Sequence, residues 1–241
     1  MYFYIDIHSH ILPKIDDGAE NFDVSMAMLR TAYADGIKGI ILTPHYKPEH
    51  HNASPERVCA LTGQLRQEME KENIDVQLYK GNEFYYHDGI FRKLEEGRAC
   101  AMAESSYILI EFGPMERFAY IRNGLYEALV HGWKPILAHA ERYNNILGKP
   151  ERVEELVRLG SCIQVNAGSI MGKTGFTVKQ FTKRLLKEHL VNFVATDAHN
   201  ADKRKPVLAD CASYISRKYG EDYAAELFFE KPMRVIRDEH I

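Results

Sequence analysis

The sequence has no excess of either charge and no hydrophobic run long enough to cross a membrane. Lys and Arg number 31 against 34 Asp and Glu, which gives a formal net charge of −3. This balance provides no electrostatic footprint for nucleic acid or an anionic membrane surface. No run of about 18 apolar residues occurs, and the N-terminal residues lack the basic and apolar regions of a secretory signal. We therefore expect no nucleic-acid partner, no membrane insertion and no export by a visible signal.

Cysteine is scarce, and its spacing argues against a disulfide framework. The chain has no C-x-x-C pair, and its four cysteines are far apart in the sequence. Disulfide-rich secreted domains carry denser and more regular cysteines, whereas scattered cysteines fit a reducing compartment. We therefore expect a cytoplasmic protein. The four residues are Cys59, Cys100, Cys162 and Cys211.

Linkers and repeats are absent as well. No Pro-, Gly- or Ser-rich stretch, low-complexity tract or short repeat divides the 241 residues. The chain is 45% hydrophobic and 27% charged, which is typical of globular proteins and excludes a disordered or collagen-like chain. A length of this size suits a single α/β domain with a sizeable core. We treat residues 1–241 as one domain.

Seven short apolar runs alternate with segments that carry helix signals. Asn21 precedes the segment 22–34, and Ser54-Pro55 and Lys149-Pro150 precede two others. This alternation is typical of parallel βαβ units, and the near-continuous hydrophobicity of the runs predicts that both sheet faces are covered. The predicted fold class is α/β with parallel strands, either an open sheet or a closed barrel. The runs span residues 2–7, 39–43, 76–79, 107–111, 135–138, 162–165 and 191–196.

Six of the seven runs end in a side chain that can bind a metal ion. In parallel α/β folds, the carboxyl ends of the strands meet at one face, where active sites lie. Strand alternation also directs both histidines of an H-x-H pair to the same side. We therefore expect these side chains to converge on one metal site. They are His8, His10, His45, Glu83, Glu111, His139, Asp197 and His199, with Asp17 as a further candidate.

This donor set exceeds the needs of a single metal ion. One zinc ion takes three or four protein ligands, whereas five imidazoles and three carboxylates follow the runs even without Asp17. We therefore expect two or three ions. Nitrogen and oxygen donors without thiolate suit Mn²⁺, Fe²⁺, Zn²⁺ or Mg²⁺. A multimetal site lowers the pKa of bound water and holds the attacking and leaving oxygens at phosphorus, which favours phosphoester hydrolysis.

Two arginines lie close to expected ligands in the sequence. Arg142 follows His139 by three positions, and Arg204 follows His199 by five. A guanidinium group can bind two phosphate oxygens through parallel hydrogen bonds. We therefore expect Arg142 and Arg204 to contact a phosphoryl group, and we count Glu111 with them as a catalytic residue.

Seven motifs occur in a fixed order along almost the whole chain. They are Asp6-Ile7-His8-Ser9-His10, Asp16-Asp17-Gly18, Thr43-Pro44-His45, Gly81-Asn82-Glu83, Ile110-Glu111-Phe112, His139-Ala140-Glu141-Arg142 and Thr196-Asp197-Ala198-His199. In this order they resemble the PHP (polymerase and histidinol phosphatase) superfamily. More narrowly, they resemble the bacterial manganese-dependent protein-tyrosine phosphatases of capsular and exopolysaccharide operons.

The resemblance implies a fold, a cofactor and a substrate. It implies a distorted seven-stranded (β/α) barrel of the PHP type, with three ions, Mn²⁺ in particular, at the carboxyl ends of the strands. The substrate it implies is phosphotyrosine on a tyrosine autokinase of polysaccharide export, hydrolysed by metal hydroxide with Arg142 and Arg204 on the phosphate. The implied ligand sets are His8, His10, Glu83 and Asp197; Glu83, Glu111 and His139; and Asp17, His45 and His199.

Three alternative functions stay open on the sequence. The same metal face could serve a small-molecule phosphatase, such as one for histidinol phosphate. An amidohydrolase also has histidines at its strand ends, but it typically bridges its metals with a modified lysine on the fourth strand, where this chain has Glu111. A metal-stabilised binding module without catalysis is the third.

Cys211 and Arg217 match the C-x5-R pattern of cysteine-dependent phosphatases. That chemistry needs a Gly-rich loop between a strand and a helix N-terminus to stabilise the thiolate. The segment has no glycine and lies within the helical pattern 206–219, which predicts a buried structural cysteine instead. Histidines in polar loops, near helix ends or at the tail are predicted not to bind metal. They are His50, His51, His131, His189 and His240.

Overall fold

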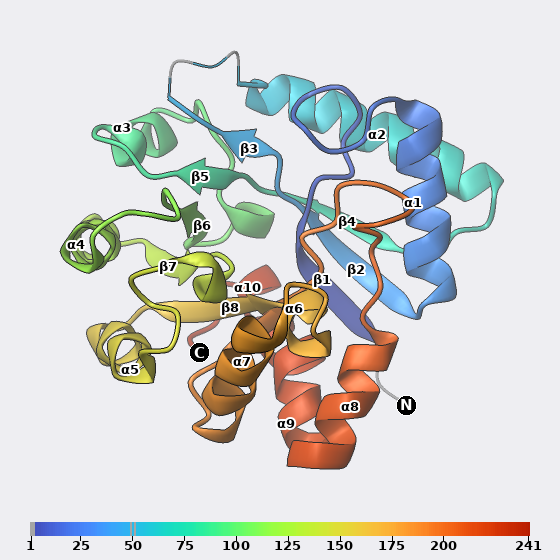
Figure 1. Cartoon of the computed structure of the whole chain (residues 1–241). Helices are drawn as coiled ribbons and strands as arrows, with labels where there is room; N and C mark the ends of the chain where they lie inside the picture. The colour runs from blue at the N-terminus through green and yellow to red at the C-terminus, as the bar shows by residue number, and fades with distance from the viewer. Residues whose placement is uncertain (1–2, 49, 51) are drawn as a thin grey trace.

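In this computed structural model, which describes residues 3–48, 50 and 52–241, each paired strand runs parallel to its neighbours. The strands form a curled sheet with helices around its outside (Figure 1). One part has the order β1-β2-β4, and the other has the order β3-β5-β6-β7-β8-β9. The strands are β1 (Tyr4–Ser9), β2 (Ile37–Leu42), β3 (His45–Tyr46), β4 (Gln77–Lys80), β5 (Glu83–Tyr85), β6 (Tyr107–Glu111), β7 (Lys134–Leu137), β8 (Cys162–Asn166) and β9 (Phe193–Ala195).

All seven predicted runs are confirmed as strands, although their ends shift by a few residues and residue 2 lies outside the described part. The short strands β3 and β5 were not predicted. They arise because the chain is irregular just beyond β2 and β4. After β2, the Thr43 N–H donates to the Ser9 carbonyl at 2.9 Å. The pairing of β3 with β5 then begins where the Glu83 N–H donates to the Pro44 carbonyl at 3.1 Å. The predicted α/β class is confirmed, with a curled parallel sheet.

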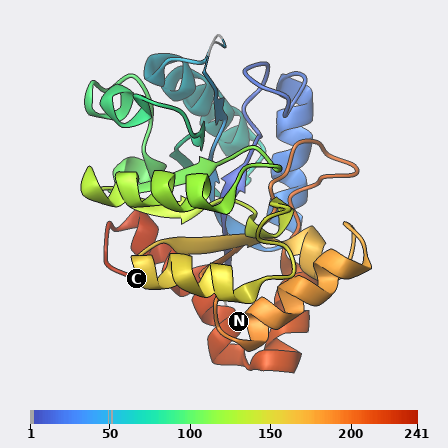
Figure 2. The same cartoon turned by 60° about the vertical axis from the view of Figure 1, so that its left-hand side comes forward.

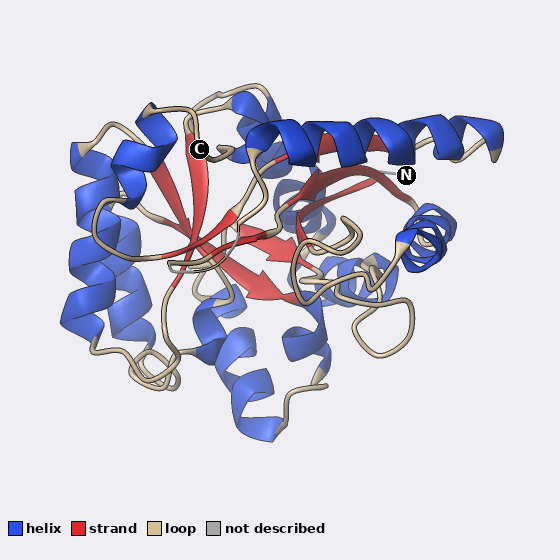
Figure 3. Ribbon diagram, turned by 90° about the horizontal axis from the view of Figure 1, so that it is seen from above, coloured by secondary structure: helices blue, strands red, loops and turns tan. Residues whose placement is uncertain are grey.

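The curl brings the first strand beside the last. The Asp197 N–H donates to the His8 carbonyl at 2.9 Å, and the His10 N–H donates to the Ala198 carbonyl at 2.8 Å. In the view from above, the strands occupy the middle and the helices the periphery (Figure 3). The H-x-H pair and the D-x-H pair therefore become neighbours, although they lie at opposite ends of the sequence.

Helices cover the outer face of the sheet, with α4 and α5 side by side (Figure 2). The predicted helix starts are confirmed: the Asn21 side chain accepts from the Val24 N–H at 3.0 Å, and Pro55 and Pro150 stand in the first turns of α2 and α5. The helices are α1 (Phe22–Ala34), α2 (Pro55–Lys71), α3 (Ile90–Glu95), α4 (Phe118–Val130), α5 (Pro150–Leu159), α6 (Ala167–Met171), α7 (Phe176–Lys187), α8 (Ala209–Tyr219), α9 (Glu221–Ala225) and α10 (Lys231–Ile236).

Two buried clusters lie on opposite faces of the sheet. Along β6, Tyr107 and Leu109 belong to one cluster and Ile108 and Ile110 to the other, as the alternation of strand side chains requires. The larger cluster also contains the buried apolar side chains of α1, α2, α4 and α5, so it fills the space between the sheet and these helices. The smaller cluster therefore fills the inside of the curl.

The inside of the curl changes from apolar to polar along the strands. Val235 of α10 joins the inner cluster, and α10 packs against β1. On β6, the inward positions are Tyr107, Leu109 and then Glu111, so the apolar column ends in a carboxylate at the carboxyl end of the strand. Buried apolar side chains thus fill one end of the curl and support the polar side chains at the other end.

None of the helices in the described part of the chain has both the length and the hydrophobicity needed to cross a bilayer. All four cysteines are free. Cys211 is buried in α8, and burial raises the pKa of its thiol, which confirms the predicted buried cysteine.

The tight contact between α4 and the sheet gives a stability prediction. A Cβ at Gly124 would lie 2.8 Å from the Tyr86 ring and 2.9 Å from the Phe112 ring. We expect Gly124→Ala to lower the free energy of unfolding by about 1–3 kcal/mol, the usual cost of overpacking. The matched control is Gly63→Ala in α2, where no atom lies within 4 Å of the new methyl group. Denaturant unfolding of both variants measures the difference, and a Gly124→Ala variant as stable as Gly63→Ala would contradict it.

Candidate metal centre

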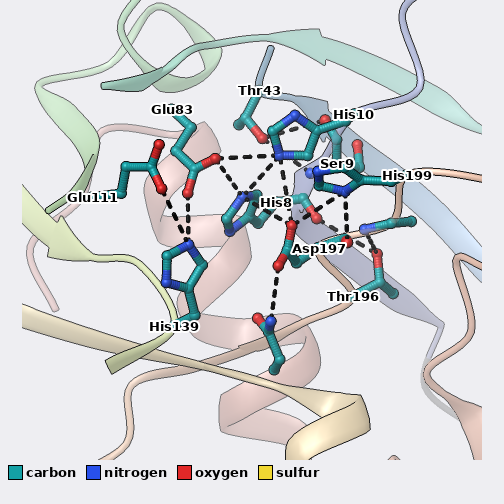
Figure 4. A network of polar contacts seen from close by, with 12 residues as sticks. His8, Ser9, His10, Thr43, Glu83, Glu111, His139, Thr196, Asp197 and His199 are labelled. Carbon is teal, nitrogen blue, oxygen red and sulfur yellow. Dashed lines mark hydrogen bonds and ion pairs between the residues drawn. The ribbon is translucent and has the colours of Figure 1, made fainter. Parts of the chain in front are cut away.

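The structure brings all nine predicted ligands together at the carboxyl ends of the strands, and most of them are drawn in Figure 4. In each of four overlapping groups, one donor atom per residue lies within 4.8 Å of the others. Six of the nine residues are buried, which is expensive for charged groups unless they are paired or bind a metal. The groups are His10, Asp17, His45 and His199; His8, His10 and Asp197; His8, Glu83 and His139; and His45, Glu83 and Glu111.

Four donor atoms converge at the end of β1. The Nε2 atoms of His8 and His10 lie 3.2 Å apart, and each lies 3.2 Å from Glu83 Oε2. Asp197 Oδ1 lies 3.6 Å from both nitrogens. Ligands bound tetrahedrally at 2.0–2.2 Å from one ion are separated from each other by about 3.3–3.6 Å. The spacing of the His8, His10 and Asp197 atoms therefore fits one ion between them, with Glu83 beside the two imidazoles.

The hydrogen bonds on the far sides of the two imidazoles explain this convergence. His10 Nδ1 donates to Asp16 Oδ2 at 2.8 Å. His8 Nδ1 donates to Gln164 Oε1 at 3.2 Å, an oxygen that also accepts the His139 N–H at 2.8 Å. In neutral rings, both Nε2 atoms then carry lone pairs that face each other and two carboxylates. Such a donor set needs a cation at its centre, so the residues fit a divalent metal.

Glu83 and Glu111 extend the cluster away from β1. His139 Nε2 lies 2.8 Å from Glu83 Oε1 and 3.8 Å from Glu111 Oε2. His45 Nδ1 lies 3.0 Å from Glu83 Oε2 and 3.2 Å from Glu111 Oε1. Both oxygens of each carboxylate therefore face an imidazole, an arrangement that suits carboxylates between neighbouring ions.

A third set of donors lies at the open edge. Asp17 Oδ1 is 3.2 Å from His45 Nε2 and 3.7 Å from His199 Nε2. The His10 and His199 rings lie with their centroids 4.0 Å apart, which brings His10 into this set as well. The three ligand sets implied by the resemblance therefore share an unbroken cluster, with His10, His45 and Glu83 at the junctions.

The pKa values of the imidazoles show how strongly the carboxylates act on them. Burial opposes the charged form of His10, but hydrogen bonds to Asp16 and Glu83 outweigh it and raise the pKa to about 9. Burial likewise opposes the charge on His45, yet hydrogen bonds to Asp17 and the two glutamates raise its pKa to about 12. His199 behaves in the opposite way, because burial and the nearby His10 lower its pKa to about 3.

The pKa values of two buried carboxylates in the cluster are lowered. Burial raises the pKa of Glu83, but its imidazole neighbours reverse this effect and leave it well below the usual range. Burial of Asp197 is likewise outweighed by His8 and Arg142, so its pKa is also lowered. The cluster thus holds ionised carboxylates beside the protonated imidazoles of His10 and His45. A bound metal ion would replace these protons, which makes metal binding a proton-releasing step.

Both predicted phosphate-binding arginines reach the cluster through Asp197. Arg142 Nη2 lies 2.9 Å from Asp197 Oδ2, and Arg204 Nη2 lies 2.8 Å from Asp197 Oδ1.

The backbones of His139 and Asp197 adopt left-handed conformations, with φ of 34° and 52°. These conformations are costly for residues other than glycine and are concentrated at functional sites.

Strand β8 supplies residues that the sequence analysis missed. It is the one predicted run that ends without a metal donor, but its polar residues Gln164 and Asn166 hold ligands in place. Gln164 accepts from His8 and from the His139 N–H, and its Nε2 donates to Asn166 Oδ1 at 2.7 Å. Asn166 Nδ2 in turn donates to Asp197 Oδ2 at 2.9 Å. Two amides at alternate positions of a buried strand were the available signal.

Acidic residues form a second supporting layer. Asp16, adjacent to the predicted ligand Asp17, accepts from His10 Nδ1 and also from the His45 N–H at 3.0 Å. Asp6 accepts hydrogen bonds from the backbone and hydroxyl of Thr196 next to Asp197. Burial raises the pKa of Asp6 to about 6. These carboxylates orient the ligands rather than join them.

The histidines predicted not to bind metal stay apart from the cluster. None of the metal-compatible groups found among residues 3–48, 50 and 52–241 includes His50, His131, His189 or His240, and His51 lies outside the described residues. His131 instead pairs with Glu95 at 2.9 Å.

A curled parallel sheet whose strand ends direct imidazoles and carboxylates at one another is typical of metal-dependent α/β enzymes. Comparison with known proteins gives its family. The chain belongs to the CpsB/CapC family of capsular polysaccharide synthesis, whose model matches residues 4–237.

Named relatives match over nearly the full length. The chain is 32% identical to the tyrosine-protein phosphatase CpsB of Streptococcus agalactiae, over 98% of this chain and all of that protein. It is 33% identical to the tyrosine-protein phosphatase YwqE of Bacillus subtilis, over 90% of this chain and 86% of the relative. A solved structure from work on YwqE and on CpsB of Streptococcus pneumoniae, described as unique metal-dependent tyrosine phosphatases, superimposes with a TM-score of 0.92. That structure is 32% identical, and the match covers 98% of this chain and 96% of the other.

The β8 amides give a prediction about metal binding. We expect Gln164→Leu to weaken Mn²⁺ binding about 10- to 100-fold, the usual effect of removing a residue that orients a metal-ligating histidine. Competition with a chromogenic chelator measures the affinity, and circular dichroism checks the fold. Gln180→Leu, on the exposed face of α7, is the matched control. Gln164→Glu, which keeps an acceptor for His8, should recover part of the affinity. Unchanged affinity in a folded Gln164→Leu variant would assign Gln164 no part in the centre.

Proposed function

We propose that this protein is a metal-dependent protein-tyrosine phosphatase of capsular polysaccharide synthesis. Full-length similarity to relatives named tyrosine-protein phosphatases supports the activity. The observation in this chain that carries the proposal is the placement of Arg142 and Arg204 against Asp197, at the edge of the metal-compatible cluster. Such a site combines side chains that can bind metal ions with guanidinium groups, a combination that suits phosphoester hydrolysis.

The substrate phosphate would enter a cavity beside the two arginines. The cavity has a volume of about 250 Å³, and its lining includes Arg142, Arg204, Asp197, Asn166 and Thr196. Both arginine side chains are about 40% exposed, whereas Asp197 is almost fully buried. The guanidinium groups can therefore bind incoming oxygens while the buried carboxylate anchors them from below.

We propose that three ions bind in the sets implied by the resemblance, with Mn²⁺ as the native metal. The ions would supply the Lewis acidity that activates water and neutralises charge at phosphorus. Arg142 and Arg204 would hold the nonbridging phosphate oxygens in a fixed orientation. Glu111, which faces His45 and His139, would help to hold the ions that position the attacking water. The products are tyrosine and inorganic phosphate.

The reaction needs no covalent phosphoenzyme. The thiol of Cys211 is buried in the middle of α8 with a raised pKa, so it is unsuited to attack phosphorus. Nothing in the C-x5-R segment would therefore take part in the reaction.

The finer sequence predictions belong to the same proposal. If β2 with β3, and β4 with β5, each count as one interrupted strand, the curled sheet becomes the distorted seven-stranded (β/α) barrel of the PHP type. Residues 1–241 then form a single catalytic domain. We further propose that the substrate is a tyrosine autokinase of polysaccharide export, acted on in the cytoplasm.

Metal removal tests the proposed function. Protein stripped with a chelator should release no phosphate from a phosphotyrosine peptide, and resupplied Mn²⁺ should restore the release, because the donor cluster needs cations to activate water. Histidinol phosphate is assayed in parallel. Faster turnover of histidinol phosphate than of the peptide would favour a small-molecule phosphatase. No hydrolysis of either compound by the metal-loaded protein would favour a binding module.

Substitution of the arginines separates the two phosphatase chemistries. We expect Arg142→Met to lower kcat at least about 100-fold, the usual effect of losing one group that stabilises transition-state charge, with the metal content retained. Arg217→Met removes the same charge from the C-x5-R segment and should leave kcat near that of the wild type, as should Cys211→Ser. Steady-state kinetics with metal analysis provide the readout. A metal-loaded Cys211→Ser variant without activity would overturn the mechanism.

A further inference from the structure

The cavity beside the two arginines carries more positive charge than a single phosphate needs. Lys173, in the loop after α6, and Lys203 and Lys205, in the loop between β9 and α8, line it together with Arg142 and Arg204. Asp197 is the one carboxylate among its described lining residues. Both loops lie beside the open end of the curl in Figure 1. We call Lys173, Lys203 and Lys205 the basic rim.

The three lysines of the basic rim form no close ion pair in the described part of the chain, although the carboxyl group of Asp35 interacts with Lys205 at longer range. Among the described residues, no carboxylate lies within ion-pair distance of the three lysines, and all three side chains are exposed. The two arginines pair with Asp197, whose own charge is shared with the neighbouring imidazoles. Because the whole chain has a net charge of −3, this positive charge is a local feature.

The other cavity at the metal cluster is different. Its lining includes Asp16, Asp17, His45 and Lys47, so acidic and basic groups are mixed there. Positive charge therefore predominates over negative charge on the arginine side. A substrate whose phosphate binds the arginines would bring its neighbouring groups over the basic rim.

We propose that the basic rim binds carboxylate side chains next to the phosphotyrosine, so that the enzyme prefers acidic protein segments. This inference rests on the proposed phosphatase function and adds the chemical class of the sequence around the phosphotyrosine. A peptide fits better than a membrane or a nucleic-acid duplex, because the lysines line a small recess next to the reacting group and not an extended flat surface. Exposed ion pairs are individually weak and are screened by salt. The preference therefore acts on KM and weakens as the ionic strength rises.

Two phosphotyrosine peptides of equal length test the inference. One carries Asp and Glu on both sides of the phosphotyrosine, and the other carries Asn and Gln at the same positions. We expect the wild type to show a KM about fivefold to tenfold lower for the acidic peptide at low salt, the size expected of two or three exposed ion pairs. The ratio of the KM for the neutral peptide to the KM for the acidic peptide should approach one in K203Q/K205Q. In K173Q this ratio should fall below the wild-type value.

The control variant K187Q/K218Q removes the same charge from exposed lysines of α7 and α8 that do not line the cavity. It should keep the wild-type ratio of KM values. Melting temperature and metal content verify that each variant is folded and loaded. Raising the salt concentration should reduce the ratio in the wild type and leave it unchanged in K203Q/K205Q.

The outcomes separate the inference from the proposed function. If the wild type hydrolyses both peptides with equal KM, or if K203Q/K205Q keeps the wild-type ratio, the basic rim has no part in substrate choice and the inference is wrong. If neither peptide is hydrolysed, the proposed phosphatase function itself fails. Equal KM values together with binding to anionic phosphatidylglycerol vesicles that K203Q/K205Q loses would assign the lysines to a membrane surface and overturn the inference.

Discussion

The structure depends on one buried carboxylate, that of Glu83. Four imidazole nitrogens, from His8, His10, His45 and His139, lie 2.8–3.2 Å from its two oxygens. A buried charge is costly unless it is paired and hydrogen-bonded, so each of these contacts also constrains the strand that supplies it. The curl of the sheet and the pairing of β1 with the segment after β9 bring the contacts within reach. The contacts that stabilise the Glu83 carboxylate are therefore the same contacts that form the candidate site.

Residues outside the donor set orient the side chains that could bind metal ions. Gln164 of β8 and the carboxylate of Asp16 bond the far sides of the His8 and His10 imidazoles and turn their Nε2 atoms inward. The left-handed backbones of His139 and Asp197 aim their side chains into the cluster at a conformational cost. The buried apolar side chains inside the curl support these residues. Asp197 then links the cluster to Arg142 and Arg204, and so to the cavity that these arginines line.

Much of this arrangement could be predicted from the sequence, because parallel strands bring their carboxyl ends together and metal donors are recognisable residue types. Eight of the nine predicted donors follow from that rule, whereas Asp17 lies in the loop after β1 and does not. The role of Gln164 did not follow, since two amides at alternate positions of a buried strand do not by themselves show which side chains they bond. The breaks after β2 and β4 depend on backbone hydrogen bonds, such as that from Thr43 to Ser9, that only the folded chain defines. The basic rim was missed because Lys173 and Lys203 come from different loops.

Anomalous diffraction from crystals of the protein grown with Mn²⁺ would show whether the strand ends form a metal centre around Glu83. We expect anomalous peaks within bonding distance of the Glu83 carboxylate, one of them also in contact with His8, His10 and Asp197. Crystals that bind manganese only at exposed carboxylates, with no peak beside Glu83, would contradict this expectation.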